Sequence, residues 1–163
     1  MSNKTVLDGM FHQLLEEITP EKLIIESCSL YGNKFTVLDK TYDLDKYKNI
    51  YLLGSGKAVI PMAKEVEKLL KSFLKKSLII GPYDCDETFD NCTDMQSTHP
   101  LPSLKSVDSA RALQEVLEQL DDDDLFIYLL SGGNSALVEL PEENITLNEF
   151  QEVTRLMLHS GMP

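Results

Sequence analysis

The stretch Asn49-Ile-Tyr-Leu-Leu-Gly-Ser-Gly-Lys57 decides the fold of this chain. Its first half is an apolar run, and its second half is a glycine-rich turn. The pattern recurs where the apolar run Leu125–Leu130 leads into Ser131-Gly-Gly-Asn-Ser135. Short apolar runs bounded by turn residues are typical of buried strands. A strand that ends in such a turn is expected to leave backbone N–H groups free at its carboxyl end, where ligand sites of open α/β sheets gather.

Helical patterns separate these strands along the chain. The predicted strands cover 49–53, 77–80 and 125–130, and the predicted helices cover about 57–75, 104–120 and 146–160. Strands that alternate with helices of this length indicate an α/β fold, with a Rossmann-like parallel sheet and helices on both faces.

The N-terminal third has a different pattern. Apolar spacing and the break at Thr19-Pro20 predict two helices, at about 4–18 and 20–29. The turn signal Gly32-Asn33 then predicts a hairpin between 28–31 and 34–38, which the segment 41–44 extends.

Helix ends near the C-terminus carry clear signals. Ser103 is a predicted N-cap, and Thr146 with Glu149 matches a capping box, in which the two side chains bond each other's backbone N–H groups. Gly161 is well placed to end the last helix.

Composition and charge restrict the function. A chain of 163 residues is the size of one domain. A net charge of −12 argues against nucleic-acid backbones and anionic membranes as partners. No apolar run reaches the ~20 residues of a membrane span, and the N-terminus lacks the apolar segment of a signal peptide. The chain is therefore expected to be cytoplasmic.

Two other features each have two interpretations. Cys28, Cys85 and Cys92 are odd in number and lack C-x-x-C spacing, which favours free thiols. The acidic loop between the last two is alternatively a metal site. The run Asp121–Asp124 is a solvated turn between a helix and a strand, or else a cation site.

The first glycine turn fits neither familiar nucleotide motif. A Walker A loop needs glycine at Tyr51 and Ser or Thr at Ala58, and a dinucleotide fingerprint needs glycine at Val59. What remains is a lysine, Lys57, at the predicted start of a helix, where the helix dipole is already positive. This placement favours contact with an anion; the alternative is a solvent-exposed lysine in an ordinary turn.

The second glycine turn and a histidine complete the candidate site. Consecutive glycines favour a close backbone approach or a positive φ; the alternative is a merely flexible loop. Ser131, Asn134 and Ser135 add neutral donors to those backbone groups. His99 precedes Pro100 in an extended stretch, where it either orients a substrate or caps a strand.

An ordered set of motifs resembles the class II glycerate kinases, also called glycerate 2-kinases, some of which are labelled hydroxypyruvate reductases. The motifs are Thr41-Tyr-Asp-Leu-Asp45, Gly54-Ser-Gly-Lys-Ala58, Thr98-His-Pro-Leu-Pro102, Leu129-Leu-Ser-Gly-Gly-Asn-Ser-Ala-Leu137 and Ile145-Thr-Leu147. The resemblance covers essentially the whole chain.

The resemblance implies a reaction and roles for the residues. The family transfers the γ-phosphoryl group of ATP to the 2-hydroxyl of D-glycerate with Mg²⁺. Lys57 would be the catalytic lysine that neutralises charge on the transferring group. His99, from its own placement, remains the candidate for binding the substrate. The nucleotide phosphates would lie on the two turns, formed by Gly54, Ser55, Gly56, Ser131, Gly132, Gly133, Asn134 and Ser135.

The chain departs from the family pattern in two ways. Family members often carry a third glycine where this chain has Asn134. The family also has a second, smaller α/β domain across the active site, which supplies an arginine, and an acidic metal-binding residue. Residues 1–163 are therefore expected to be an incomplete N-terminal domain of a two-domain kinase, without metal ligands of its own and inactive alone.

Other readings remain open from the sequence. A non-catalytic module that binds a nucleotide or a sugar phosphate would use the same turns and would need no Mg²⁺. A hydroxypyruvate reductase is weakened by the missing dinucleotide fingerprint. An apolar face left exposed would allow a homodimer.

Overall fold

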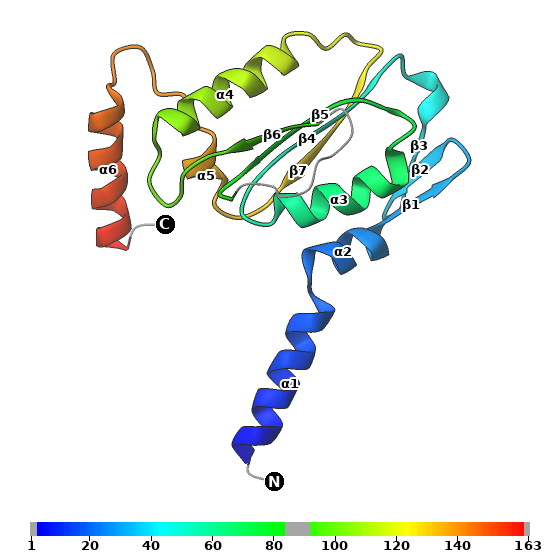
Figure 1. Ribbon diagram of the computed structural model, residues 1–163, viewed down its shortest axis with the longest axis horizontal. Helices are drawn as coiled ribbons and strands as arrows, with labels where there is room; N and C mark the ends of the chain where they lie inside the picture. The colour runs from blue at the N-terminus through cyan, green and yellow to red at the C-terminus, as the bar shows by residue number, and fades with distance from the viewer. Residues whose placement is uncertain (1–2, 84–91, 162–163) are drawn as a thin grey trace.

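The computed structural model describes residues 3–83 and 92–161 of the chain (Figure 1). Cys85 and the acidic loop around it lie outside the described residues. The remaining two cysteines, Cys28 and Cys92, are not in a disulfide, as the preference for thiols predicts. No described helix is long and apolar enough to cross a membrane.

A parallel sheet of four strands forms the centre of the molecule. The strands are β4 (Ile50–Ser55), β5 (Leu74–Gly81), β6 (Cys92–Gln96) and β7 (Leu125–Leu130), in the order β6-β5-β4-β7. β4 lies between two neighbours, and all six of its residues are buried. The expected parallel sheet is confirmed.

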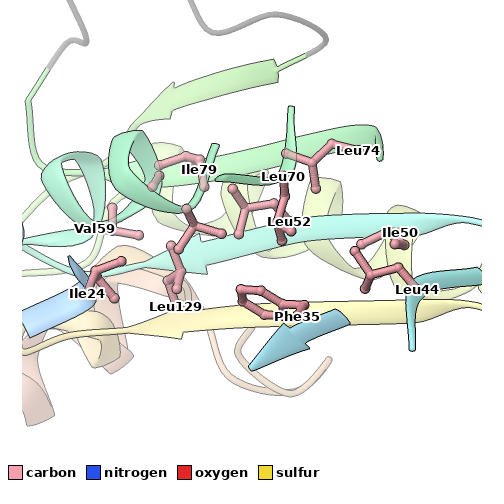
Figure 2. Packing of buried hydrophobic residues seen from close by; sticks show 12 residues of the cluster. Ile24, Phe35, Leu44, Ile50, Leu52, Val59, Leu70, Leu74, Ile79 and Leu129 are labelled. Atoms are coloured by element: carbon pink, nitrogen blue, oxygen red, sulfur yellow. The ribbon is translucent and has the colours of Figure 1, made fainter. Parts of the chain in front are cut away.

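Helices cover both faces of this sheet, as predicted. α3 (Val59–Leu70) lies against one face and α4 (Leu104–Leu117) against the other (Figure 1). Side chains alternate along a strand, so Ile50 and Leu52 join the cluster on the α3 side, while Tyr51 and Leu53 join the cluster on the α4 side. Figure 2 shows the first cluster, in which Leu52 is almost completely buried. Burial of one such leucine contributes about 1.5–3 kcal/mol.

The N-terminal elements attach to the α3 side. They are α1 (Asn3–Glu17), α2 (Pro20–Ser27), the antiparallel strands β1 (Cys28–Tyr31), β2 (Lys34–Val37) and β3 (Lys40–Asp43), and a short 3₁₀ helix, η1 (Leu44–Lys46). Thr19 caps α2, since its hydroxyl accepts from Lys22 N–H. α1 projects away from the rest of the molecule with its apolar residues exposed (Figure 1).

The C-terminal capping signals are confirmed. The Ser103 side chain caps α4, and Thr146 and Glu149 form the predicted capping box of α6 (Leu147–Ser160). Gly161 follows α6 with a φ of +68°, the left-handed conformation that ends many helices. A single turn of helix, α5 (Asn134–Leu137), comes directly after the second glycine turn.

Two boundaries predicted from sequence are wrong. The helix expected over 57–75 ends at Leu70, and β5 already begins at Leu74, although the strand was expected at 77–80. Lys75 and Lys76 fit the solvent-exposed face of a helix in the sequence pattern. In the structure they lie on a strand whose residues are all buried only from Ser77 onward. The edge strand β6 was missed because its residues, Cys-Thr-Asp-Met-Gln, are mostly polar, as suits a strand with a partner on only one side among the described residues.

Candidate functional site

The two glycine turns meet at one edge of the sheet. β4 and β7 are adjacent and parallel, and Ser55 at the end of β4 is paired with Leu130 at the end of β7. The turns that follow these residues therefore begin side by side. The sequence places them 75 residues apart, counting from Gly56 to Ser131 (131 − 56).

The first turn uses its N–H groups to hold its neighbours. Gly56 N–H donates to Ile80 O at 3.2 Å, and Lys57 N–H donates to Gly132 O at 2.9 Å. Ala58 N–H donates to Ser131 Oγ at 3.0 Å. The expectation that this turn leaves its N–H groups free is therefore wrong. Its backbone supports the second turn.

Gly56 is required where it stands. Its φ is +133°, and a Cβ at this position would lie 2.1 Å from Ser131 Oγ and 2.7 Å from Ser131 O. A side chain would drive the two turns apart, because the backbone of Ser131 cannot yield as a flexible side chain does. The close approach of the two turns thus depends on this glycine.

The second turn keeps donors available. Among the described residues, the N–H groups of Gly132 and Gly133 have no hydrogen-bond acceptor. Gly133 has a φ of +87°, and a Cβ there would lie 3.0 Å from Lys57 Cγ and 2.9 Å from His99 Cδ2. Lys57, Gly133 and His99, which come from three separate segments, are therefore in close contact.

Lys57 and His99 are both exposed at the mouth of a cavity of about 260 Å³. The cavity is lined by Lys57, Pro82, Tyr83, Gln96, Ser97, Thr98, His99 and Lys105. Among the described residues, its charged groups are two lysines, Lys57 and Lys105, and no carboxylate lines it. These two positive charges lie within a chain of net charge −12. Lys57 precedes α3 by two residues, so it stands just before the helix and not in its first turn.

Buried hydroxyls fix the segment that carries His99. Ser97 Oγ donates to Leu137 O at 2.7 Å, and Ser106 Oγ donates to Ala136 O at 2.7 Å. Ser106 Oγ also accepts from Ser103 N–H and lies 3.3 Å from Thr98 Oγ1. These bonds join the His99 segment, the start of α4 and the turn of helix after the second glycine turn.

Further buried bonds join the two turns. Ser55 Oγ lies 2.5 Å from the Tyr128 hydroxyl and donates to Asn134 Oδ1. Sequence reasoning named Ser55 and Asn134 but missed Tyr128, Ser97, Ser106 and Lys105. For Tyr128 the signal was its place as the only residue with a polar group in the run Leu125–Leu130. The supporting serines have no sequence signal of their own, because their partners are distant backbone carbonyls.

The acidic run Asp121–Asp124 lies at the other edge of the sheet, in the turn before β7. Lys48 pairs with Asp121 at 3.2 Å, and Asn49 bonds Asp124 at 2.7 Å, so the run Asp121–Asp124 has protein partners in the turn before β7. Among the described residues there is no group of three or more His, Cys, Asp or Glu that could hold a metal ion. Just beyond α5, burial raises the pKa of the Glu139 carboxyl.

Comparison with known families decides the assignment. A domain family described as a domain of unknown function, DUF4147, matches residues 6–163. The chain belongs to this family. It is 34% identical to a D-glycerate 2-kinase of Thermotoga maritima over 69% of the chain, and 29% identical to a glycerate kinase of Danio rerio over 94% of the chain.

Solved structures agree with the fold of this family member. A Pyrococcus horikoshii protein superposes over 100% of the chain with a TM-score of 0.82, and the glycerate kinase of Thermotoga maritima superposes over 98% with a TM-score of 0.75, each at 25% identity. The chain spans 33% of the Danio rerio relative, 27% of the Thermotoga maritima relative and 36% of each solved structure. The resemblance to the N-terminal portion of the glycerate 2-kinases is confirmed.

Proposed function

We propose that this chain provides the phosphate-binding wall of a glycerate 2-kinase, which transfers the γ-phosphoryl group of ATP to the 2-hydroxyl of D-glycerate. The observation that carries the proposal is the contact of Lys57 with Gly133 beside His99, in a chain whose relatives are named glycerate kinases. D-glycerate is a small hydroxy acid, and the cavity of about 260 Å³ falls just below the usual 300–1,000 Å³ of ligand pockets.

In this proposal Lys57 is the catalytic residue that neutralises negative charge. Phosphoryl transfer depends on positioning and on electrostatic stabilisation, since charge spreads over the equatorial oxygens of the transferring group. The Lys57 side chain lies across the second turn, with Cε 3.9 Å from the Cβ position of Gly132. Its ammonium group can therefore bind the same anion as the N–H groups of Gly132 and Gly133.

The second turn, Ser131 to Ser135, is proposed to bind the phosphates of the nucleotide. It combines two N–H groups that lack an acceptor among the described residues with hydroxyl and amide side chains. Gly54, Ser55 and Gly56 are proposed to contribute as the support that holds the second turn in place. Their own backbone groups are occupied or buried.

His99 is proposed to orient the acceptor. Its ring lies close to Gly133 and borders the same cavity as Lys105. A carboxylate such as that of glycerate would find two lysines and a histidine there. This placement favours contact of the glycerate carboxylate with His99 and Lys105. The transferring phosphate would then contact Lys57.

The donor set suits phosphate and does not suit a metal ion. Lysine ammonium and backbone N–H groups bind anions, whereas Mg²⁺ prefers oxygen ligands and above all carboxylates. The described lining of the cavity offers no carboxylate. Mg²⁺ would enter as the complex with ATP, where it offsets phosphate charge, and the roles proposed for Lys57, His99 and the second turn do not depend on it.

Titration calorimetry with ATP, with and without Mg²⁺, tests the proposal. We expect saturable binding by the unaltered chain and a loss of roughly tenfold or more in affinity in Lys57→Ala, since a hydrogen bond to a charged group contributes about 1.5–3 kcal/mol. Lys40→Ala on β3 removes the same charge in the other sheet and should bind ATP as the unaltered chain does.

The contrary outcomes are specific. Equal losses in Lys57→Ala and Lys40→Ala would mean that net charge alone sets the affinity. Equal binding of plain sugar phosphates, without any effect of Mg²⁺, would favour a non-catalytic binding module. Tight NADH binding would favour a reductase. The chain alone is expected to show negligible glycerate phosphorylation, which a coupled assay for ADP would measure.

A further inference from the structure

One buried hydroxyl links the two glycine turns through side chains. Ser55 at the end of β4 has no exposed surface. Its Oγ contacts the hydroxyl of Tyr128 on β7 at 2.5 Å and Oδ1 of Asn134 in the second turn. The three groups therefore form a continuous chain of hydrogen bonds, Tyr128–Ser55–Asn134, beneath the turns.

The direction of this chain follows from counting protons. A serine hydroxyl has one proton, and Ser55 donates it to Asn134 Oδ1, because a side-chain carbonyl oxygen can only accept. The proton in the Tyr128–Ser55 bond must then come from Tyr128. Tyr128 is thus the donor that starts the chain, and Asn134 is the acceptor at its end.

The position of the Tyr128 hydroxyl beside Ser55 is set by the sheet and by packing of the ring. It is paired with Leu53 across β4 and β7, and Ser55 lies two residues further along the same face of β4. Such diagonal neighbours are within reach of an aromatic side chain. The Tyr128 ring packs against the buried cluster on the α4 side, so its hydroxyl has a defined place beside Ser55.

The chain also determines which donor Asn134 presents. A primary amide is planar, so when Oδ1 turns to Ser55 the Nδ2 group points away from it. Among the described residues Nδ2 has no hydrogen-bond partner, and it is not a buried unsatisfied atom. Asn134 therefore offers two N–H donors that a glycine at this position would lack.

We propose that Tyr128 is a positioning residue, which acts through Ser55 to hold the Asn134 amide with its Nδ2 group available to a phosphate oxygen. The inference rests on the proposed function for the identity of the anion. The orientation of the amide stands without it. Asn134, which stands where family members often carry a third glycine, then adds a hydrogen-bond donor to the site.

The orientation is tested first without ligand. In ¹⁵N-edited NMR spectra we expect the side-chain amide of Asn134 to give one resolved pair of Nδ2–H signals in the unaltered chain. In Tyr128→Phe these signals should move or broaden, since Ser55 loses its donor and the amide can turn over. Tyr51→Phe removes a hydroxyl from the same buried cluster and should leave them unchanged.

The consequence for binding is tested with the Mg²⁺ complex of ATP. Loss of one well-placed hydrogen bond corresponds to roughly three- to tenfold in affinity, which we expect for Tyr128→Phe and for Asn134→Ala. In the Asn134→Ala background, Tyr128→Phe should have no further effect, because Tyr128 acts only through the amide. Thermal midpoints of all variants control for loss of fold.

The outcomes separate the two proposals. Asn134 signals that do not respond to Tyr128→Phe would overturn the positioning role, whether or not ATP binds. An equal loss of affinity from Tyr128→Phe in both backgrounds would also overturn it, since a merely structural residue acts regardless of Asn134. Absence of ATP binding by the unaltered chain would contradict the proposed function, and the ligand-free spectra would still decide the orientation.

Discussion

Gly133→Ala should damage the site far more than Gly132→Ala, although the two glycines are neighbours. Gly133 has a φ of +87°, a conformation that strains any residue with a side chain, whereas Gly132 does not have a positive φ. A Cβ on Gly133 would lie 2.9 Å from His99 Cδ2 and 3.0 Å from Lys57 Cγ, while one on Gly132 would meet nothing nearer than Lys57 Cε at 3.9 Å. The two variants therefore add the same methyl group at neighbouring positions, one crowded and one open.

The magnitude for Gly133→Ala follows from two opposing effects. A left-handed conformation costs an L-residue about 1–2 kcal/mol. Loss of backbone freedom in the unfolded chain offsets about 0.4–1 kcal/mol of this. The net destabilisation is about 1 kcal/mol, or roughly 2–4 °C in the thermal midpoint of a chain this long. The exposed His99 ring can move away from the added methyl group. The clash therefore adds little to the loss of stability and mainly shifts the side chains of the site.

Thermal melts and ATP titrations of both variants check this reasoning. Gly133→Ala should lower the midpoint by a few degrees and weaken ATP binding, because Lys57 and His99 are pushed from their places. Gly132→Ala should leave the midpoint unchanged or slightly raised. If the two variants melt and bind alike, the convergence of Lys57, Gly133 and His99 does not form the site.

Three further predictions concern the support of the fold. Ser106→Ala should cost about 1–3 kcal/mol in a chemical unfolding curve, because it leaves the buried Ala136 carbonyl without its donor, and an unchanged curve would contradict this. The Thr146 hydroxyl and N–H lower the pKa of Glu149, so the α6 cap should be intact above the ordinary pKa of about 4.3 and lost as the pH falls through the lowered folded value. NMR signals of α6 should show this loss, and Glu149→Gln should abolish its pH dependence. Phe11→Glu on the exposed α1 should change stability by less than about 0.5 kcal/mol and reduce any self-association seen by ultracentrifugation; a large drop in stability would mean that α1 is packed.

Much of the fold could be predicted because local signals agree with it. The run Leu125–Leu130 is a strand with those bounds, and the Thr146–Glu149 box starts a helix one residue later. Such features depend on neighbours in the sequence. The failures at 74–76 and 92–96 have the opposite origin: the polar residues there lie in strands only because β4 and β5 offer those strands partners.

For the candidate site, the sequence indicated the two turns, Lys57 and His99, but not the contacts that connect them. Glycine patterns indicated both turns, but they could not show that the first turn's N–H groups bind Gly132 O and Ser131 Oγ. Those acceptors lie more than seventy residues away in sequence. The same holds for Tyr128, whose partner is set by the register of β4 against β7. Contacts between strands therefore decide which donors remain for a ligand.

The central claim is that the two glycine turns form one phosphate site with Lys57. The most direct measurement is a ¹H–¹⁵N NMR titration of the chain with the Mg²⁺ complex of ATP. The account predicts the largest shifts at the N–H groups of Gly132 and Gly133, with smaller ones at Lys57 and His99. In Lys57→Ala the shifts at the two glycines and at His99 should need roughly tenfold or more ATP. Shifts confined to another surface, such as Lys75 and Lys76 at the other end of β5, would contradict it.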